Sequence, residues 1–317
     1  MTDTLYIPVG PNIMAGSLSF MRDYASSAEA MFTKLNYLPS LHNQFQYLVI
    51  DVVKSCQTLR DTALTAKMTL EKNLKALASL EDELTNAQRA EKDILAEHTA
   101  LPANVKRNMR EWTDQLSNQL SSIKSPLKPG LTQRYLEESA KDQVDAETAL
   151  TLLNEKKVEL QKQRQTLTDA IDAFSRGSTA DNNKGTPLTQ QSLTQLGMAA
   201  PEIAVIMLAV EQMKETIGKI GEGIRFTDMV KQRDTLVNEI KDQSTSIALK
   251  EKQIVTLKGQ IEFINILQTL DNQLKIYTND YQHVIDNFRV FTAQTDADFQ
   301  VNTQQFITFL TPLSNPW

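Results

Sequence analysis

The sequence predicts an all-α protein: an elongated antiparallel helical bundle, or coiled-coil stalk, that carries a hydrophobic head. Three observations support this fold class. Glycine and proline number only 10 each among 317 residues, so turn signals are too rare for many short strands. Apolar residues recur at alternating spacings of three and four over long stretches, as they do in packed helices. One segment, residues 196–226, is far more apolar than the rest of the chain.

The N-terminal part predicts an extended arm and two helices. Residues 1–16 contain two prolines and two glycines, a composition typical of an arm without regular structure. A first helix is expected over residues 17–37. Pro39 then starts a second helix, because the first turn of a helix does not need the missing N–H. This second helix is expected to continue to about His98, since neither glycine nor proline interrupts residues 40–101.

The central part predicts two further helices separated by a turn. Pro102 marks an expected break, after which a shorter helix runs as far as Ile123. The run 125–130 contains two prolines and a glycine and therefore predicts a turn. Apolar residues at heptad spacing then extend from 131 to 174. The polar residues 176–187, which include two glycines and a proline, predict a flexible linker.

The C-terminal part predicts one very long helix. Its apolar seam runs from Phe226 towards Leu310 and meets one glycine and no proline. Six of the eleven phenylalanines lie between Phe263 and Phe309, so this region is expected to be the most thickly packed part of the bundle. The tail 310–317 contains two prolines and is not expected to remain helical.

These elements predict three regions and exclude some functions. The regions are an extended arm (1–16), a helical bundle of stalk and tail (17–176 and 227–317), and a hydrophobic head with its linker (177–226). The net charge of −6 argues against a nucleic-acid partner, because phosphate contacts need clustered Lys and Arg. No run of 18 uninterrupted apolar residues occurs, so a constitutive membrane span is not expected. The N-terminus lacks the pattern of a secretory signal peptide, which predicts secretion by another route.

The sequence predicts neither an enzyme nor a cofactor or metal site. The chain contains three histidines, at His42, His98 and His283. None has the spacing or neighbours of a metal ligand. Residues 218–223 resemble a phosphate-binding loop, but Ile220 stands where that loop needs Ser or Thr. The only cysteine, Cys56, lies among apolar neighbours and is expected to be a small buried side chain, not a reactive thiol.

The apolar segment changes character along its length. Pro201 suits the first turn of a helix, and Glu202 lies beside it, where the helix dipole favours an acid. A continuous stripe at spacings of three and four follows: Ile203, Ile206, Val210, Met213, Ile217, Ile220 and Ile224. In the first two turns the other faces are apolar too, whereas from Glu211 onwards they carry charges. The segment is therefore apolar all round at its start and amphipathic at its end.

This gradient has two interpretations. A helix over residues 201–217 would span about 25 Å, short of the roughly 30 Å hydrocarbon layer. With one charged face, it would be stable in a membrane only as part of a water-lined ring or lying in the interface. The other interpretation is a buried central helix of an ordinary bundle. Gly218, Gly221 and Gly223 each weaken a helix by about 1 kcal/mol relative to Ala and predict a hinge, which favours a head that rearranges.

Long antiparallel heptad helices around one hydrophobic head with a glycine-rich exit resemble the cytolysin A-type α-helical pore-forming toxins. The head sequence PEIAVIMLAVEQMKETIGKIGEGIRF is similar to the B component of xenorhabdolysin-type binary cytotoxins. The resemblance implies a soluble form that assembles with a separate A component into a hetero-oligomeric ring. That ring would form on a target-cell lipid membrane, and the amphipathic helix would insert there to line a lytic pore.

The resemblance also implies roles for individual residues. The expected membrane-inserting residues are Met198, Ile203, Val205, Ile206, Met207, Leu208, Val210, Met213 and Ile217. The expected polar residues that face the pore are Glu211, Lys214, Glu215 and Glu222. Glu202 lies on the opposite side of the helix from Glu211, so it would sit at the membrane boundary or be protonated when inserted.

A non-enzymatic coiled-coil scaffold or tether is the alternative function, with residues 203–224 as a partner-binding helix. Aspartate in place of Val205 and Leu208 would separate the two functions. A pore-forming protein should lose lysis and keep its fold. A scaffold with this segment in its core should lose thermal stability, because buried unpaired charges are costly.

Overall fold

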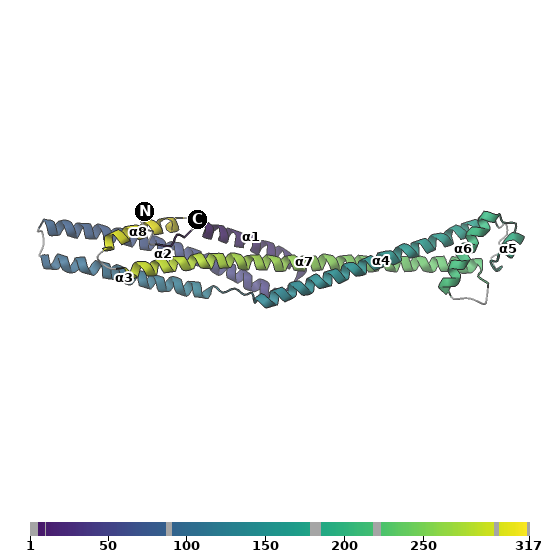
Figure 1. The fold of residues 1–317 in the computed structure, drawn as a ribbon, viewed down its shortest axis with the longest axis horizontal. Coiled ribbons are helices and arrows are strands. Elements are labelled where there is room, and N and C mark those ends of the chain that lie inside the picture. Colours follow the sequence, from purple (N-terminus) through teal and green to yellow (C-terminus); the bar gives the residue numbers. More distant parts are fainter. Residues whose placement is uncertain are drawn as a thin grey trace. The chain divides into compact units, whose positions relative to one another are not determined.

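The computed structural model of the chain describes residues 6–9, 11–86, 91–177, 185–217, 223–294 and 298–315. Within these residues all regular structure is helical, which confirms the predicted all-α fold class (Figure 1). The helices are α1 (Pro11–Leu35), α2 (Pro39–Thr85), α3 (Glu91–Ser122), α4 (Pro129–Gly177), α5 (Gln190–Gln195), α6 (Ala200–Ile217), α7 (Phe226–Ala293) and α8 (Phe299–Ser314).

Two predicted boundaries near the N-terminus are wrong. Helix α1 begins at Pro11 and not at Ser17, so residues 11–16 are helical instead of extended. Proline is well tolerated at the first position of a helix, which explains this earlier start. Helix α2 ends at Thr85 and not at His98, and the N–H of Asn86 donates to the carbonyl of Asp82 at 3.0 Å as the helix terminates.

Two prolines expected to stop helices lie inside them. Pro102 is buried within α3, and Pro312 lies within α8, which continues to Ser314. A proline removes one helical hydrogen bond and strains the preceding turn. In both helices the surrounding turns are anchored by burial: Val105, one turn after Pro102, and Leu313, which follows Pro312, are each only 1% exposed. Tertiary packing therefore outweighs the local signal at these two positions.

The long C-terminal helix is also shorter than predicted. Helix α7 starts at Phe226 as expected but ends at Ala293, and α8 begins at Phe299. The chain divides into two compact units, the first made of residues 1–137 and 259–317 and the second of residues 138–258.

The first unit has an aromatic core. Helices α1, α2, α3 and α8 pack around the C-terminal part of α7 (Figure 1). Phe306 of α8 lies among other rings, with centroids 4.7 Å from Phe291, 5.1 Å from Phe288 and 5.1 Å from Tyr6. Large aromatic side chains in offset or edge contact supply much of the apolar area that such a core buries.

A buried side chain of α7 holds the segment that precedes α1. Asn287 is fully buried. Its Oδ1 accepts a hydrogen bond from the N–H of Ile7 at 2.8 Å, and its Nδ2 donates to the carbonyl of Ile7 at 2.7 Å. Tyr6 beside it is 8% exposed. These contacts order residues 6 and 7 without any helix of their own.

The second unit is a two-helix pair with a small head. Helices α4 and α7 run antiparallel here, since Glu147 pairs with Lys258 at 3.3 Å and Gln243 Nε2 donates to the carbonyl of Leu153 at 2.8 Å. Their shared seam buries Ala146, Ile254 and Leu257. Where α4 ends and α7 begins, α5 and α6 pack against the pair (Figure 1) and enclose a separate apolar core, called here the head core.

Candidate functional site

Helix α6 is the most apolar helix of the head and begins as the sequence predicts. Pro201 is its second residue and Glu202 lies in its first turn. The N–H of Ala199 donates to Glu202 Oε2 at 3.2 Å, and the N–H of Ile203 donates to the carbonyl of Ala199 at 3.1 Å. Glu202 thus occupies the third helical position and caps the N–H of the residue before the helix, as the acid of a capping box does.

One face of α6 is buried in the head core. Ile206 and Ala209 are fully buried, and Val210 and Met213 are each 2% exposed. Ile203, Val205 and Met207 are half-buried, whereas Leu208 is 64% exposed. The residues predicted to insert therefore do not share one environment in this structure: most are covered, and Leu208 is not.

The predicted polar residues lie on the opposite face. Glu211, Lys214 and Glu215 are exposed, and Lys214 Nζ donates to Glu211 Oε1 at 2.7 Å. Exposed pairs of this kind contribute little to stability. The three charged side chains keep this face hydrated while Ile206, Val210 and Met213 are buried on the other.

Most walls of the head core come from residues that the sequence did not assign to the site; Met198 and Ile224 are the exceptions. Phe174 near the end of α4 stacks on Phe226 at the start of α7, with ring centroids 4.6 Å apart. Other walls are Leu167, Ala170, Ile171, Leu188, Leu193, Met198, Ile224, Met229 and Leu236. The seam periodicity of α4 and α7 marks several of these positions as apolar, but it does not show that they enclose α6.

A short bridge closes the base of the head. Pro187 and Arg225 form a single antiparallel bridge, and the N–H of Leu188 donates to the carbonyl of Ile224 at 2.7 Å. A Cβ on Gly223 would lie 2.7 Å from the Cβ of Pro187, so only glycine permits this approach. The predicted stripe ran on through Ile224 in one helix, which is wrong, because α6 ends at Ile217 and Ile224 lies outside it, just before the bridge residue Arg225.

Several predicted positions fall outside the description. Gly218, Gly221 and Glu222 lie outside the described residues. Ile217 is the last residue of α6. The hinge and part of the pore-facing set therefore stay predictions.

The exposed edge of α6 borders a groove shared with α4. This groove has a volume of about 420 Å³ and is lined by Asp169, Asp172 and Arg176 of α4 and by Glu202, Val205 and Leu208 of α6. Leu208 and Val205 thus present apolar surface within a mainly charged rim. Measured by length and hydropathy, none of the helices in the described part of the chain meets the requirements of a membrane span.

No protein-family model matches the sequence, and no curated protein matches it. Solved structures do match it. PaxB from Photorhabdus luminescens superposes with a TM-score of 0.79 over 98% of this chain and 97% of PaxB, at 12% identity. The chain has the fold of PaxB. XaxB from Xenorhabdus nematophila matches with a TM-score of 0.74 over 97% of this chain and 98% of XaxB, at 13% identity.

A further match comes from an assembly. A chain of the XaxAB pore complex from Xenorhabdus nematophila has a TM-score of 0.68 over 98% of both chains, at 14% identity. At these identities the likeness is one of fold, and it extends over both compact units and the head.

Proposed function

We propose that this chain is a subunit of an α-pore-forming cytotoxin, equivalent to the B component of a binary toxin. It assembles with an A component into a hetero-oligomeric ring on a target-cell lipid membrane, where the ring forms a lytic pore. The observation that carries this proposal is the match with a chain of the XaxAB pore complex over 98% of both chains. The proposed activity involves no enzymatic step and no cofactor.

Helix α6 is the proposed inserting element. Its apolar residues, together with Met198 and Ile217, would contact lipid or neighbouring subunits, and Glu211, Lys214, Glu215 and Glu222 would face the pore. The two sides of α6 already differ in this structure, with Ile206 and Val210 buried and Glu211 and Lys214 exposed. The segment that follows, with Gly218, Gly221 and Gly223, is the proposed hinge.

The energetics favour insertion only after assembly. Withdrawal of Ile206, Val210 and Met213 from the head core would expose side chains whose burial stabilises the fold by about 1.5–3 kcal/mol each. A charged residue at the centre of a bilayer costs about 2.5–3.5 kcal/mol, and α6 carries Glu202, Glu211, Lys214 and Glu215. Neighbouring subunits would cover the apolar face and keep the charged face in water. The proposed protein thus converts from a soluble form to an inserted form when it assembles.

Dye release from liposomes tests the proposed activity. The protein alone should release little dye, and the protein mixed with an A component should release most of it. Circular dichroism of the same preparation verifies that the chain is helical. A folded protein whose mixtures with A components never permeabilise lipid would contradict the pore-forming function.

A reversible disulfide tests the proposed movement of the head. A Cβ on residue 177 would lie 3.1 Å from the Cγ of Met198. The sulfur of a cysteine at position 198 would take the place of that Cγ, and in a disulfide each Cβ lies about 3 Å from the partner sulfur, given an S–S bond of about 2.05 Å. The variant Cys56→Ser/Gly177→Cys/Met198→Cys would therefore link the end of α4 to the entry of α6. We expect the oxidised variant to be inactive and the reduced variant to regain dye release.

The matched controls are the two variants that carry only one of these cysteines in the Cys56→Ser background. They should be active under both redox conditions. If the oxidised double variant releases dye as fast as the reduced one, the head does not need to leave α4, although the protein could still form pores.

A further inference from the structure

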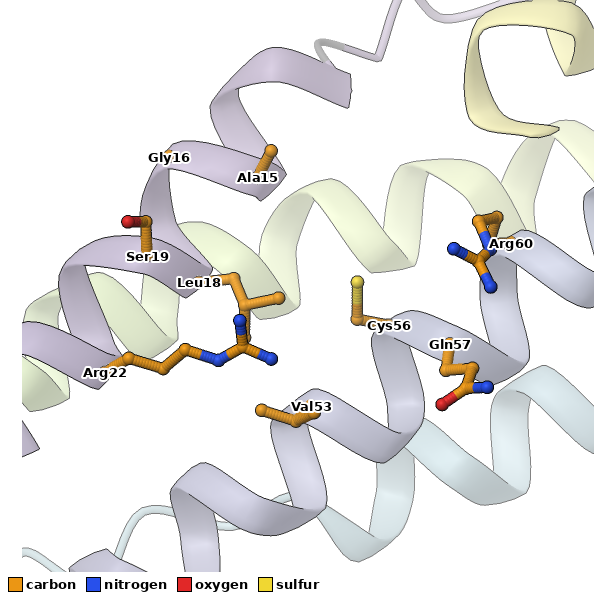
Figure 2. Close-up of a pocket in the computed structure, with 9 residues that line it drawn as sticks. All are labelled: Ala15, Gly16, Leu18, Ser19, Arg22, Val53, Cys56, Gln57 and Arg60. Carbon is orange, nitrogen blue, oxygen red and sulfur yellow. The ribbon is translucent and has the colours of Figure 1, made fainter. Parts of the chain in front are cut away.

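A second candidate site lies in the first unit, in a cavity between α1 and α2 (Figure 2). Its volume is about 630 Å³, which is in the range of small-molecule sites. Leu18 of α1 and Val53 of α2 supply apolar walls, and Ser19 and Gln57 supply polar groups. The residues that line the cavity belong to the first unit, whereas α6 belongs to the second.

The cavity has a distinct positive charge. Arg22 of α1 and Arg60 of α2 both line it, and no acidic side chain does. Arg60 has Asp61 at 3.6 Å, but both side chains are substantially exposed, so the pairing is weak. No acidic residue in the described part of the chain forms a salt bridge with Arg22. In a chain of net charge −6, two guanidinium groups that converge on one cavity without a lining carboxylate favour an anionic ligand.

Cys56 lines the same cavity as the two arginines. Its sulfur lies between the two guanidinium groups in Figure 2. Burial raises the pKa of the Cys56 thiol, and the positive charges of Arg22 and Arg60 act in the opposite direction. Both guanidinium groups are therefore close enough to influence a charge at the sulfur. The sequence indicated a small buried side chain, whereas the structure shows Cys56 half-buried in the wall of a cavity.

We propose that this cavity binds a small organic anion, with a carboxylate or phosphate group carried on a compact apolar body. A guanidinium group matches both oxyanions, because its planar N–H fork donates two parallel hydrogen bonds. The Ser19 hydroxyl and the Gln57 amide have further donors for the same oxygens. Leu18 and Val53 then contact the apolar body.

Selective alkylation of Cys56 tests this proposal. Iodoacetate is an anion and iodoacetamide is its neutral analogue, and both react with the thiolate to form a C–S bond and release iodide. Because Cys56 is the only cysteine, the mass increase reports one site. The quantity measured is the alkylation rate with iodoacetate divided by the rate with iodoacetamide. A change in the thiolate fraction affects both rates equally and cancels, so this ratio reports the attraction of the anion to the site. We expect this ratio to fall about tenfold in Arg22→Gln/Arg60→Gln, as two nearby charges in a partly buried site would produce.

Lys54→Gln is a matched control. Lys54 is on α2, two residues from Cys56, and does not line the cavity. Its replacement removes a positive charge from the same helix and should leave the ratio within about twofold of wild type, because Lys54 does not line the cavity and solvent screens its charge from the anion. Equal ratios in wild type and in the double arginine variant would overturn the proposal.

Protection experiments identify the source of the anion. Hexyl phosphate, inorganic phosphate and vesicles of dioleoylphosphatidylglycerol are each added during iodoacetamide treatment of the full chain. Protection by hexyl phosphate indicates a free organic anion, and protection by the vesicles alone indicates a lipid headgroup. In either case protection must be lost in Arg22→Gln/Arg60→Gln.

Thermal unfolding provides an independent readout should alkylation be slow. The ligand that protects should raise the unfolding midpoint of wild type and of Lys54→Gln, but not that of the double arginine variant. The absence of both protection and a midpoint shift with all three probes would refute an anion site. Dye release by the same variants is measured separately, so failure of this proposal is distinguishable from failure of the proposed pore.

Discussion

Leu208 is 64% exposed while its neighbours on α6, Ile206 and Ala209, are fully buried. A leucine at such a position contributes little to the folded state. In the proposed inserted state the same side chain would face lipid or another subunit. A substitution at Leu208 can therefore impair the proposed insertion without destabilising the fold. Substitutions at the buried residues of α6 would affect both.

Substitution of Leu208→Asp should abolish most dye release and leave the fold intact. The free energy of unfolding is expected to change by less than about 0.5 kcal/mol, as for other surface substitutions. Insertion of an aspartate near the centre of a bilayer costs about 2.5–3.5 kcal/mol per subunit, so dye release with an A component should fall at least tenfold. Leu249→Asp is the control, because Leu249 of α7 has a similar exposure of 65%. Equal dye release by the two variants would remove Leu208 from the inserting surface.

Two buried tyrosines in the first unit should respond differently to loss of the hydroxyl. Tyr277 and Tyr281 are both fully buried. The hydroxyls of Tyr277 and Ser55 are hydrogen-bonded at 2.8 Å, whereas the Tyr281 hydroxyl has no hydrogen-bond partner among the described residues. Tyr277→Phe should lower the free energy of unfolding by about 1 kcal/mol.

Tyr281→Phe should be neutral or stabilising, because it removes a buried hydroxyl that gains no protein hydrogen bond. Urea denaturation of the two variants and of wild type measures the difference. Comparable destabilisation by both substitutions would show that the Tyr281 hydroxyl contributes to stability in a way that the Ser55 contact does not explain.

At the scale of secondary structure, the sequence predicted a helix correctly where apolar residues recur at helical spacing over many turns. The ladders of α2, α4 and α7 predicted these helices, and the starts of α2 and α7 were right. Pro102 and Pro312 misled because a proline is a local signal, while burial of the turns around it is decided by distant residues. Helix α5 was missed because it has only six residues and too few turns to show a period.

In the head, too, local features were predictable from the sequence and contacts between distant residues were not. The apolar and charged faces of α6 followed directly from its sequence. The stacking of Phe174 on Phe226 and the bridge between Pro187 and Arg225 did not, because each joins residues far apart in the chain. Gly223 was expected at a hinge on the basis of helix propensity, but its close approach to Pro187 is a property of two segments that only the structure brings together.

Gly223→Ala should weaken the base of the head. The added Cβ would lie 2.7 Å from that of Pro187, so the bridge must open or shift, at a cost of about 1–3 kcal/mol. Amide hydrogen exchange at Leu188, whose N–H is bonded to Ile224, should become faster. Gly185→Ala is the matched control, since a Cβ there meets nothing within 4 Å. Unchanged exchange at Leu188 in Gly223→Ala would contradict the close approach.

At the scale of the whole molecule, the two units rely on different interactions. The first packs several helices around buried aromatic rings, whereas the second relies on one seam between two helices and on the head core. A seam needs only an apolar side chain at every third or fourth residue. This requirement explains how the fold can match PaxB at 12% identity: many apolar residues satisfy the same position.

The first unit should be sensitive to alkaline pH. Burial raises the pKa of Tyr6 to about 12, and burial also raises the pKa values of Tyr277 and Tyr281. The folded state therefore favours the neutral phenols. The corresponding stability is complete below the unfolded tyrosine pKa of about 10 and is lost as pH rises from about 10 through 12 and beyond.

Tyrosine absorbance and circular dichroism, recorded together during an alkaline titration, measure this effect. A late phase of tyrosine ionisation should coincide with loss of helix. Tyr6→Phe should lose less stability than wild type between pH 10 and 12, because it lacks one of these groups. A parallel decline of the two proteins would show that Tyr6 ionises without a cost to folding.

The contact between Asn287 and Ile7 has a consequence for how the N-terminus is held. The carboxamide of Asn287 directs one N–H and its carbonyl oxygen at Ile7, the same donor and acceptor that a neighbouring β-strand would offer. Ile7 is therefore paired as in a sheet, but with a side chain that imitates the backbone. Asp at position 287 would keep the acceptor and lose the donor, and Leu would lose both. Because the imitation covers one residue only, Ile7 is placed without the register that a true strand must find, and the buried Tyr6 ring beside it holds the segment against α8.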